Sequence, residues 1–253
     1  MNRMNWTKAG PLVALAGCAL AGAPAHAGVV PTGGIEAATD EVRRGISWSG
    51  GDPVASADVQ AEVAGFDASA RVVTTRGADR HAGADAVADL ELGKSFDAGA
   101  LTLRGAVTGH VFAGAERKMD YVELGLGARY GLGPLDMGVG AIFAPSQSAI
   151  GGDNLYLYTN ARVGLPAFPI SLTAAAGYTT GGSDGSLRAA RLRPGGDYAD
   201  WRVGLEYSQF PFTVGVDYAG NDISKARALA SGSPYADAAH IGDRVVARLR
   251  FGF

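Results

Sequence analysis

The sequence of 253 residues contains one cysteine, Cys18, which lies in an apolar N-terminal segment. It has no CxxC pair and no phosphate-binding glycine loop, which argues against a zinc or nucleotide-binding protein. After residue 28, no run of about 18 consecutive apolar residues could form a membrane-spanning helix. Charged residues make up only 19% of the chain, and the net charge of −3 gives no indication of nucleic-acid binding.

The N-terminal segment has the features of a secretion signal. A positively charged start precedes an apolar stretch at residues 11–23, and Ala-His-Ala at residues 25–27 fits a small-x-small cleavage site. We therefore expect residues 1–27 to be a signal peptide that is cleaved during export. Leu-Ala-Gly-Cys at residues 15–18 also resembles a lipoprotein box, so lipidation of Cys18 is an alternative. Cleavage after residue 27 would leave a chain without cysteine, and hence without disulfides.

The remainder of the chain is rich in glycine and in stretches where apolar and polar residues alternate. Period-two alternation is typical of a β-strand with one apolar and one polar face. We identify about 12 such strands, many of roughly 9–11 residues, the length that a tilted strand needs to cross a bilayer. The predicted strands cover residues 35–49, 54–64, 66–75, 86–94, 101–112, 121–132, 135–143, 155–165, 170–179, 201–210, 212–220 and 244–253. The first of them alternates least clearly.

The predicted connections alternate between short and long. The short ones are Gly65, residues 95–99, residues 133–134, residues 166–169 and Pro211. The longer, more polar ones include residues 76–86, 145–153, 181–197 and 221–243. Outer-membrane barrels have short periplasmic turns and longer external loops. The sequence therefore predicts an all-β fold, a transmembrane antiparallel up-and-down β-barrel of about 12 strands over residues 28–253, in a Gram-negative outer membrane.

Within these strands the charged residues share one parity and the bulky apolar residues share the other. In a membrane barrel the apolar parity faces lipid and the charged parity faces the interior. The predicted pore-lining residues are Arg44, Arg71, Arg104, Glu123, Arg129, Arg162, Arg202, Glu206, Asp217, Arg248 and Arg250. Further inward acids are Asp67, Asp89, Glu91, Asp136 and Asp200. Because acids and bases nearly balance, we expect no strong selectivity for anions or cations.

The last strand ends on an aromatic residue, with Phe251 and Phe253 on its apolar parity. Tyr207, Phe210, Phe212 and Phe168 also fall near the predicted short-turn end, as an interfacial aromatic girdle should. A terminal aromatic on such a strand resembles the signal that the outer-membrane barrel assembly machinery recognises. We therefore predict that Phe251 and Phe253 form an assembly signal.

Several blocks resemble the TorF family of porins over nearly the whole mature chain. They are TDEVRRGISWSGGDP (39–53), DYVELGLGARYG (120–131), YLYTNARVGLP (156–166) and GDYADWRVGLEYS (196–208). The resemblance implies an outer-membrane pore. That family favours aromatic residues where Glu41 and Arg43 stand, and in the predicted register these two charges would face lipid, where charge is costly. Either the first strand is bulged or its register differs.

The predicted function is passive diffusion of small polar solutes or ions through the barrel. Only His81, His110 and His240 remain in the mature chain, and no GxSxG motif or metal-ligand spacing accompanies them. We therefore expect no enzyme activity, cofactor or metal, and read His110 as a polar residue of the lumen. The expected partners are outer-membrane lipids, the assembly machinery and the solutes, with no nucleic acid. A closed, side-chain-filled barrel acting as a structural or surface-interaction protein is the alternative.

Overall fold

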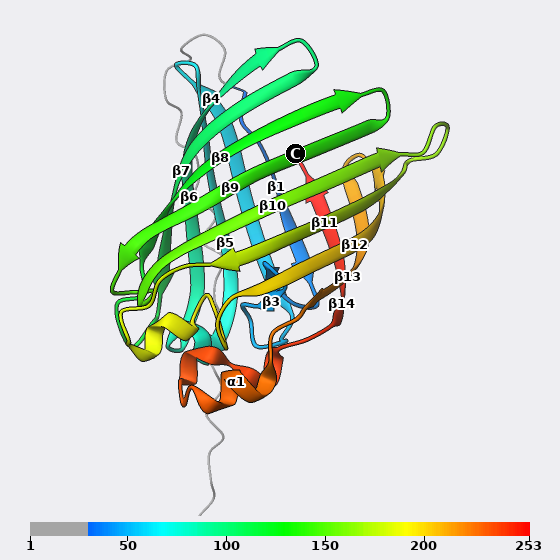
Figure 1. The fold of residues 1–253 in the computed structure, drawn as a ribbon. Helices are drawn as coiled ribbons and strands as arrows, with labels where there is room; N and C mark the ends of the chain where they lie inside the picture. Colours follow the sequence, from blue (N-terminus) through cyan, green and yellow to red (C-terminus); the bar gives the residue numbers. More distant parts are fainter. Residues whose placement is uncertain (1–29) are drawn as a thin grey trace, which may run out of the picture.

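The computed structural model describes residues 30–253, so the predicted signal peptide and Cys18 lie outside the described residues. Within them, twelve antiparallel strands close into a single barrel, as Figure 1 shows. The predicted all-β barrel of about 12 strands is therefore confirmed. No helix in this part of the chain is long and apolar enough to cross a membrane.

Each strand of the barrel pairs with its neighbours in sequence, and β1 closes the ring by pairing with both β4 and β14. The strands are β1 (Thr32–Ala38), β4 (Val54–Val63), β5 (Phe66–Ala78), β6 (Ala84–Ala98), β7 (Leu101–Ala113), β8 (Tyr121–Leu132), β9 (Leu135–Gln147), β10 (Gly152–Gly164), β11 (Ile170–Thr180), β12 (Tyr198–Gln209), β13 (Phe212–Asn221) and β14 (Arg244–Gly252). Gly33 and Phe253 exchange two backbone hydrogen bonds, of 3.0 and 2.9 Å, at the seam. Closure satisfies the backbone groups that an open sheet edge would leave unpaired.

The two ends of the barrel differ. The short-turn end carries residues 64–65, 99–100, 133–134, 165–169 and 210–211, together with the start of β1 and the end of β14. The long-loop end carries residues 39–53, 79–83, 114–120, 148–151, 181–197 and 222–243. Strands β5, β6, β9 and β10 extend further into residues 76–86 and 145–153 than the sequence predicted, which shortens those two loops.

Side chains on the outer face are apolar and exposed. Leu126 is 71% exposed, Val203 58% and Leu249 51%. The aromatic residues predicted to form a girdle are also exposed, and they lie around the short-turn end: Phe168, Tyr207, Phe210, Phe212 and Phe251. A surface this apolar on every strand needs an apolar environment to cover it.

The prediction for the first strand, residues 35–49, is wrong. β1 ends at Ala38, and residues 39–53, here termed the lumenal hairpin, leave the wall and enter the barrel. Within this segment β2 (Val42–Arg43) pairs only with β3 (Ile46–Ser47). Glu41 and Arg43, which the predicted register placed on the lipid side, instead lie inside the barrel, where they contact inward residues.

Local chemistry explains why the chain turns inward there. Arg44 and Gly45 have φ angles of 50° and 70°, a left-handed pair that reverses the chain. The Asp40 carboxylate accepts hydrogen bonds from the Ser47 and Ser49 hydroxyls at 2.7 and 2.8 Å, which closes the base of the hairpin. Successive charges in this segment occupy both parities, so a strand in the wall would have exposed some of them to lipid.

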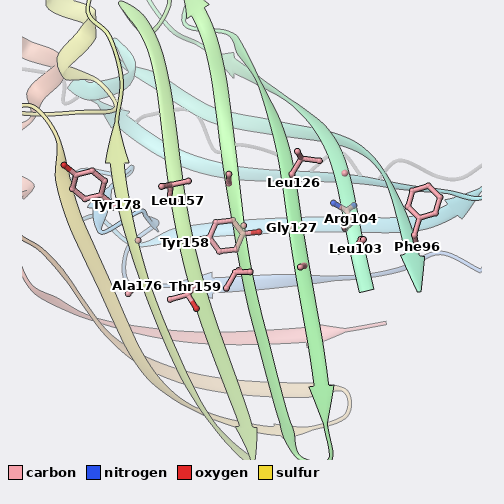
Figure 2. A pocket seen from close by; sticks show the side chains of 16 residues that line it. Phe96, Leu103, Arg104, Leu126, Gly127, Leu157, Tyr158, Thr159, Ala176 and Tyr178 are labelled. Carbon is pink, nitrogen blue, oxygen red and sulfur yellow. The ribbon is translucent and has the colours of Figure 1, made fainter. Parts of the chain in front are cut away.

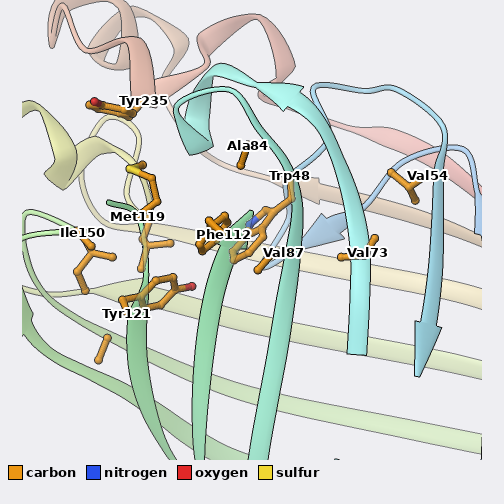
Figure 3. Packing of buried hydrophobic residues seen from close by; sticks show 13 residues of the cluster. Trp48, Val54, Val73, Ala84, Val87, Phe112, Met119, Tyr121, Ile150 and Tyr235 are labelled. Atoms are coloured by element: carbon orange, nitrogen blue, oxygen red, sulfur yellow. The ribbon is translucent and has the colours of Figure 1, made fainter. Parts of the chain in front are cut away.

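Two hydrophobic clusters fill the long-loop end. The larger contains Trp48 of the lumenal hairpin, Phe112 of β7 and Tyr235 of the last loop, as Figure 3 shows. The smaller includes Ile46 of the hairpin and Tyr198 of β12. Five short helices surround these clusters: η1 (Asp79–His81), η2 (Leu187–Ala190), α1 (Lys225–Ala230), η3 (Pro234–Ala236) and η4 (Ala238–His240). We term the loops at residues 79–83, 114–120, 148–151, 181–197 and 222–243 together the cap, because they meet over the lumen.

Candidate functional site

Ion pairs attach the lumenal hairpin to one side of the barrel. Arg43 donates to both carboxylate oxygens of Asp89 on β6, at 3.1 and 2.7 Å. Arg44 donates to Glu123 on β8 at 2.6 Å. Because all four side chains are at least four-fifths buried, these pairs are weakly screened by water and salt.

Hydrogen bonds attach the same hairpin to the other side of the barrel. The Tyr198 hydroxyl on β12 donates to the Arg44 carbonyl at 3.0 Å, and the Asn221 amide on β13 donates to the Gly45 carbonyl at 2.7 Å. A Cβ atom at Gly45 would lie 2.7 Å from Cβ of Asp200. Only glycine therefore fits at the hairpin tip, and the tip is held from two sides of the barrel.

The base of the hairpin is also paired with the wall. Arg71 of β5 donates to both oxygens of Glu41, at 2.7 and 2.9 Å. Arg244, at the start of β14, donates to Asp40 at 2.6 Å. The hairpin is thus fixed to the wall at its base as well as at its tip, and any solute that crosses the barrel must pass beside it.

His110 of β7 lies between the two acids that hold the hairpin. Its Nδ1 is 2.7 Å from Asp89 and its Nε2 is 3.3 Å from Glu123. Across residues 30–253 no serine hydroxyl hydrogen-bonds to a histidine, and no group of three His, Cys, Asp or Glu side chains could hold a metal ion. The geometry at His110 is that of a polar contact in the wall.

The predicted pore-lining residues all lie on the inner side of the barrel, with Arg44 on the hairpin. Most of the strand arginines lie within 4 Å of a carboxylate, and these pairs are Arg71–Glu41, Arg104–Glu91, Arg129–Asp136, Arg162–Glu206, Arg248–Asp217 and Arg250–Asp58. Arg202 differs, because it donates to the Val42 carbonyl at 3.2 Å and has no carboxylate partner among the described residues. Three of these pairs join neighbouring strands, two reach across one strand and one joins β5 to the hairpin, and this pairing explains the near balance of charge.

Sequence reasoning did not single out four inward residues. Glu36 and Asp58 join the ion pairs with Arg71 and Arg250, and Tyr156 and Tyr158 lie on the inner face of β10. Parity would have placed Tyr156 and Tyr158 inward, because Leu155 and Leu157 of the same strand face outward. Neither tyrosine carries a charge, so the charge pattern gives no indication of them.

Inward glycines let long side chains lie against the wall. A Cβ atom at Gly93 would lie 2.5 Å from Nη2 of Arg104, and one at Gly140 would lie 2.5 Å from Cζ of Tyr158. Gly215 stands in the same relation to Arg248, whose Nε would be 2.7 Å away. These side chains therefore cover the backbone of the adjacent strand instead of projecting into the lumen.

The inner part of the lumen is hollow and polar. A cavity of about 410 Å³ lies beside the hairpin tip, and a second of about 370 Å³ lies toward the short-turn end, where Thr32 and Glu62 line it. The two share Ser69, Glu91 and Arg104 and therefore adjoin. Together they form a polar passage from the short-turn end to the hairpin.

An apolar hollow of about 900 Å³ lies over β6–β11 on the outer side, where residues such as Ala128 and Ala141 are small (Figure 2), and it shares Gly127 and Tyr158 with the lining of the 410 Å³ cavity. The inward positions Gly127 and Gly140 of the same strands carry no side chain, so little side-chain mass covers the sheet on its inner face as well as on its outer face.

Two buried arginines hold the cap together. Arg80 donates to the carbonyls of Ser47, Arg191, Tyr235 and Ala236, at 3.2, 2.8, 3.3 and 2.9 Å. Burial lowers the pKa of this guanidinium. The Arg80 guanidinium thus joins its own loop to the lumenal hairpin and to the loops at residues 181–197 and 222–243. It satisfies carbonyl oxygens that would otherwise be buried without partners.

The second buried arginine, Arg191, joins other loops. It donates to the carbonyls of Met119 and Ala149 at 2.6 and 3.0 Å, and burial lowers its pKa to about 10. Its Nη2 is 3.3 Å from Nδ1 of His81. Burial, together with the charges of Arg191 and Arg80, holds the pKa of His81 well below its usual range, so this imidazole is neutral at pH 7.

Residues 22–244 match the model of a family called Gcw_chp, described as a bacterial protein of unknown function. The chain belongs to the Gcw_chp family. The match includes the lumenal hairpin, all loops of the cap and the barrel strands from β1 to β13. It ends at Arg244, the first residue of β14. No curated protein matches the sequence.

Among solved structures, this Gcw_chp member is similar to the KdgM porin, with a TM-score of 0.55 and 9% identity over 88% of this chain and 99% of that chain. An outer membrane channel from Pseudomonas putida F1 gives a TM-score of 0.53 and 10% identity over 88% of this chain and 94% of that chain. At such low identity the likeness concerns the fold alone. The Gcw_chp barrel therefore shares its architecture with outer-membrane channels.

Proposed function

We propose that this Gcw_chp barrel is an outer-membrane channel for the passive diffusion of small polar solutes or ions, and that it is not an enzyme. The observation that carries the proposal is the polar passage of two adjoining cavities, about 410 and 370 Å³, that runs from the short-turn end to the lumenal hairpin. A barrel whose interior served only for packing would fill that space with side chains.

Three other observations support an outer-membrane location. The outer face is apolar and exposed on every strand, which suits lipid. The sequence resembles the TorF family of porins and begins with a predicted signal peptide. The fold is similar to that of the KdgM porin. In this orientation the short turns are periplasmic, the cap is external and the barrel assembly machinery inserts the chain.

The lumenal hairpin is the constriction of the proposed channel. It crosses the lumen between Asp89 and Glu123 on one side and Tyr198 and Asn221 on the other. Flux therefore depends on how firmly the hairpin is held. Because acids and bases of the wall are paired, we expect weak selectivity between anions and cations.

Single-channel recording in planar lipid bilayers tests this proposal. The wild-type chain should give discrete current steps, and Arg43→Ala/Arg44→Ala, which removes the ion pairs of the hairpin with Asp89 and Glu123, should give larger or longer openings. Arg129→Ala is the matched control, because Arg129 is 68% exposed near the short-turn end and pairs only with Asp136. Silence from all three proteins, when each is folded and heat-modifiable, would refute the channel.

A closed structural or surface-interaction barrel is the second candidate. The cap favours it, because two clusters of buried residues and the fully buried Arg80 and Arg191 cover the long-loop end. On this alternative the inner charges stabilise the wall and no current flows, even after the hairpin is released. The same recordings therefore separate the two candidates.

A further inference from the structure

The 410 Å³ cavity beside the hairpin contains one aromatic surface, the ring of Tyr158. This ring lies over the backbone of two neighbouring strands, as Figure 2 shows. A Cβ atom would lie 2.5 Å from Cζ of Tyr158 if placed at Gly140, and 3.1 Å from its hydroxyl if placed at Gly127. The ring therefore lies against the wall and is partly exposed, and it stacks with the Tyr156 ring at a centroid distance of 5.8 Å.

The charges around this cavity are equal in number and already paired. The lining includes the cations Arg44, Arg71 and Arg104 and the acids Asp89, Glu91 and Glu123. Arg44 pairs with Glu123 at 2.6 Å and Arg104 pairs with Glu91 at 2.9 Å. A charged solute would gain no net attraction here and would compete with existing ion pairs. An apolar solute would have to desolvate them.

Hydrogen-bonding capacity nevertheless remains unused in the lining. The side chains of Arg104 and Glu91, both in the lining, are 35% and 31% exposed, so they are accessible to a solute although they pair with each other. The Ser69 hydroxyl, also in the lining, makes no hydrogen bond to another described residue. These donors and acceptors can hydrogen-bond to a polar solute.

We propose that this cavity binds a neutral carbohydrate through one or two pyranose rings. The C–H face of a pyranose is apolar and stacks on the exposed part of the Tyr158 ring, whereas its hydroxyls can accept from guanidinium groups and donate to carboxylates. The volume lies within the range of small-ligand sites, roughly 300–1,000 Å³. This inference rests on the proposed function, because it names the class of solute that uses the same passage.

Calorimetry on the full chain, expressed with its N-terminal segment and purified in detergent, tests the site without requiring current. Glucose, maltose and sucrose are the probes, with glycerol and sodium glutamate as comparators. At least one sugar should bind saturably, and neither comparator should. Tyr158→Ala should weaken that binding by about tenfold and Tyr158→Phe should preserve it, because the ring face makes the contact.

Tyr178→Ala is the matched control, because Tyr178 lies on the outer face of β11 and is 46% exposed. It should bind the sugar as the wild type does. Heat-modifiability establishes that each variant is folded. The inference is overturned if none of the three sugars binds, if glutamate or glycerol binds as well, or if Tyr158→Ala binds as tightly as wild type.

Bilayer recordings distinguish this failure from failure of the channel proposal. Sugar binding without current would support the sugar site and refute the channel. Current without sugar binding would support the channel and refute the sugar site. If both proposals hold, the sugar should reduce ion current through the wild-type barrel in a saturable manner. The reduction should be weaker in Tyr158→Ala.

Discussion

Replacing Arg80 should open the cap and leave the barrel folded. Its four hydrogen bonds to carbonyl groups come from a charged donor, and such bonds contribute about 1.5–3 kcal/mol each, or about 6–12 kcal/mol together. Burial of the guanidinium offsets several kcal/mol of this. We therefore expect Arg80→Met to lose about 3–5 kcal/mol of cap stability. That loss shifts the local opening equilibrium by about two to four orders of magnitude.

Hydrogen exchange measured by mass spectrometry is the assay. Peptides from residues 181–197 and 222–243 should lose protection in Arg80→Met, whereas peptides from the strands should not. Arg188→Met is the control, because Arg188 is partly exposed and donates one bond of 3.2 Å to the Ser148 carbonyl. Equal protection of both loops in Arg80→Met and wild type would refute the view that this residue joins the cap.

Three further predictions concern pH, lumen width and assembly. Because the pKa of His81 is held well below its usual range, the folded cap keeps it neutral while the opened loop takes up a proton below about pH 6.5. Cap stability should thus be constant above that pH and fall by up to about 1.4 kcal/mol per pH unit below it, measured as lower protection factors in the loops at pH 5 than at pH 7, after each rate is divided by the intrinsic exchange rate at that pH. Gly140→Leu should displace Tyr158 into the lumen and reduce single-channel conductance. Deleting Phe253 removes both seam hydrogen bonds to Gly33 and should reduce the amount of heat-modifiable protein in outer membranes.

Each of these has a matched control. His81→Phe should flatten the pH dependence, and an unchanged slope in that variant would assign the effect to another group. Ala141→Leu places the same side chain on the outer face of β9 and should leave conductance unchanged. Phe253→Tyr keeps both backbone bonds and an aromatic ring, so assembly as poor as in the deletion would contradict the predicted signal.

Strands with regular alternation could be predicted from the sequence. The bounds predicted for β8, residues 121–132, are those observed, because a single parity there is apolar along the whole strand and Gly-Pro follows it. Parity also placed Arg104 and Arg248 on the inner side. A local pattern suffices for these features, because the side-chain period of a strand is two whatever the partner strand.

The lumenal hairpin and the cap could not be predicted, because contacts distant in sequence determine them. Arg43 pairs with Asp89, 46 positions away, and Arg80 bonds to Tyr235, 155 positions away. The local indications that residues 35–49 do not form one strand were its weak alternation and the misplaced charges Glu41 and Arg43. Nothing in the residues around Arg80 indicates that it binds carbonyl groups of other loops.

The lumenal hairpin also affects the mechanics of the barrel. A closed ring of strands without internal contacts can flatten into an ellipse when the bilayer presses on it, since its hydrogen bonds resist stretching more than bending. Here Arg43 and Arg44 tie β6 and β8 through the hairpin to Tyr198 on β12 and Asn221 on β13. The hairpin therefore resists flattening of the barrel along the direction that joins these two sides.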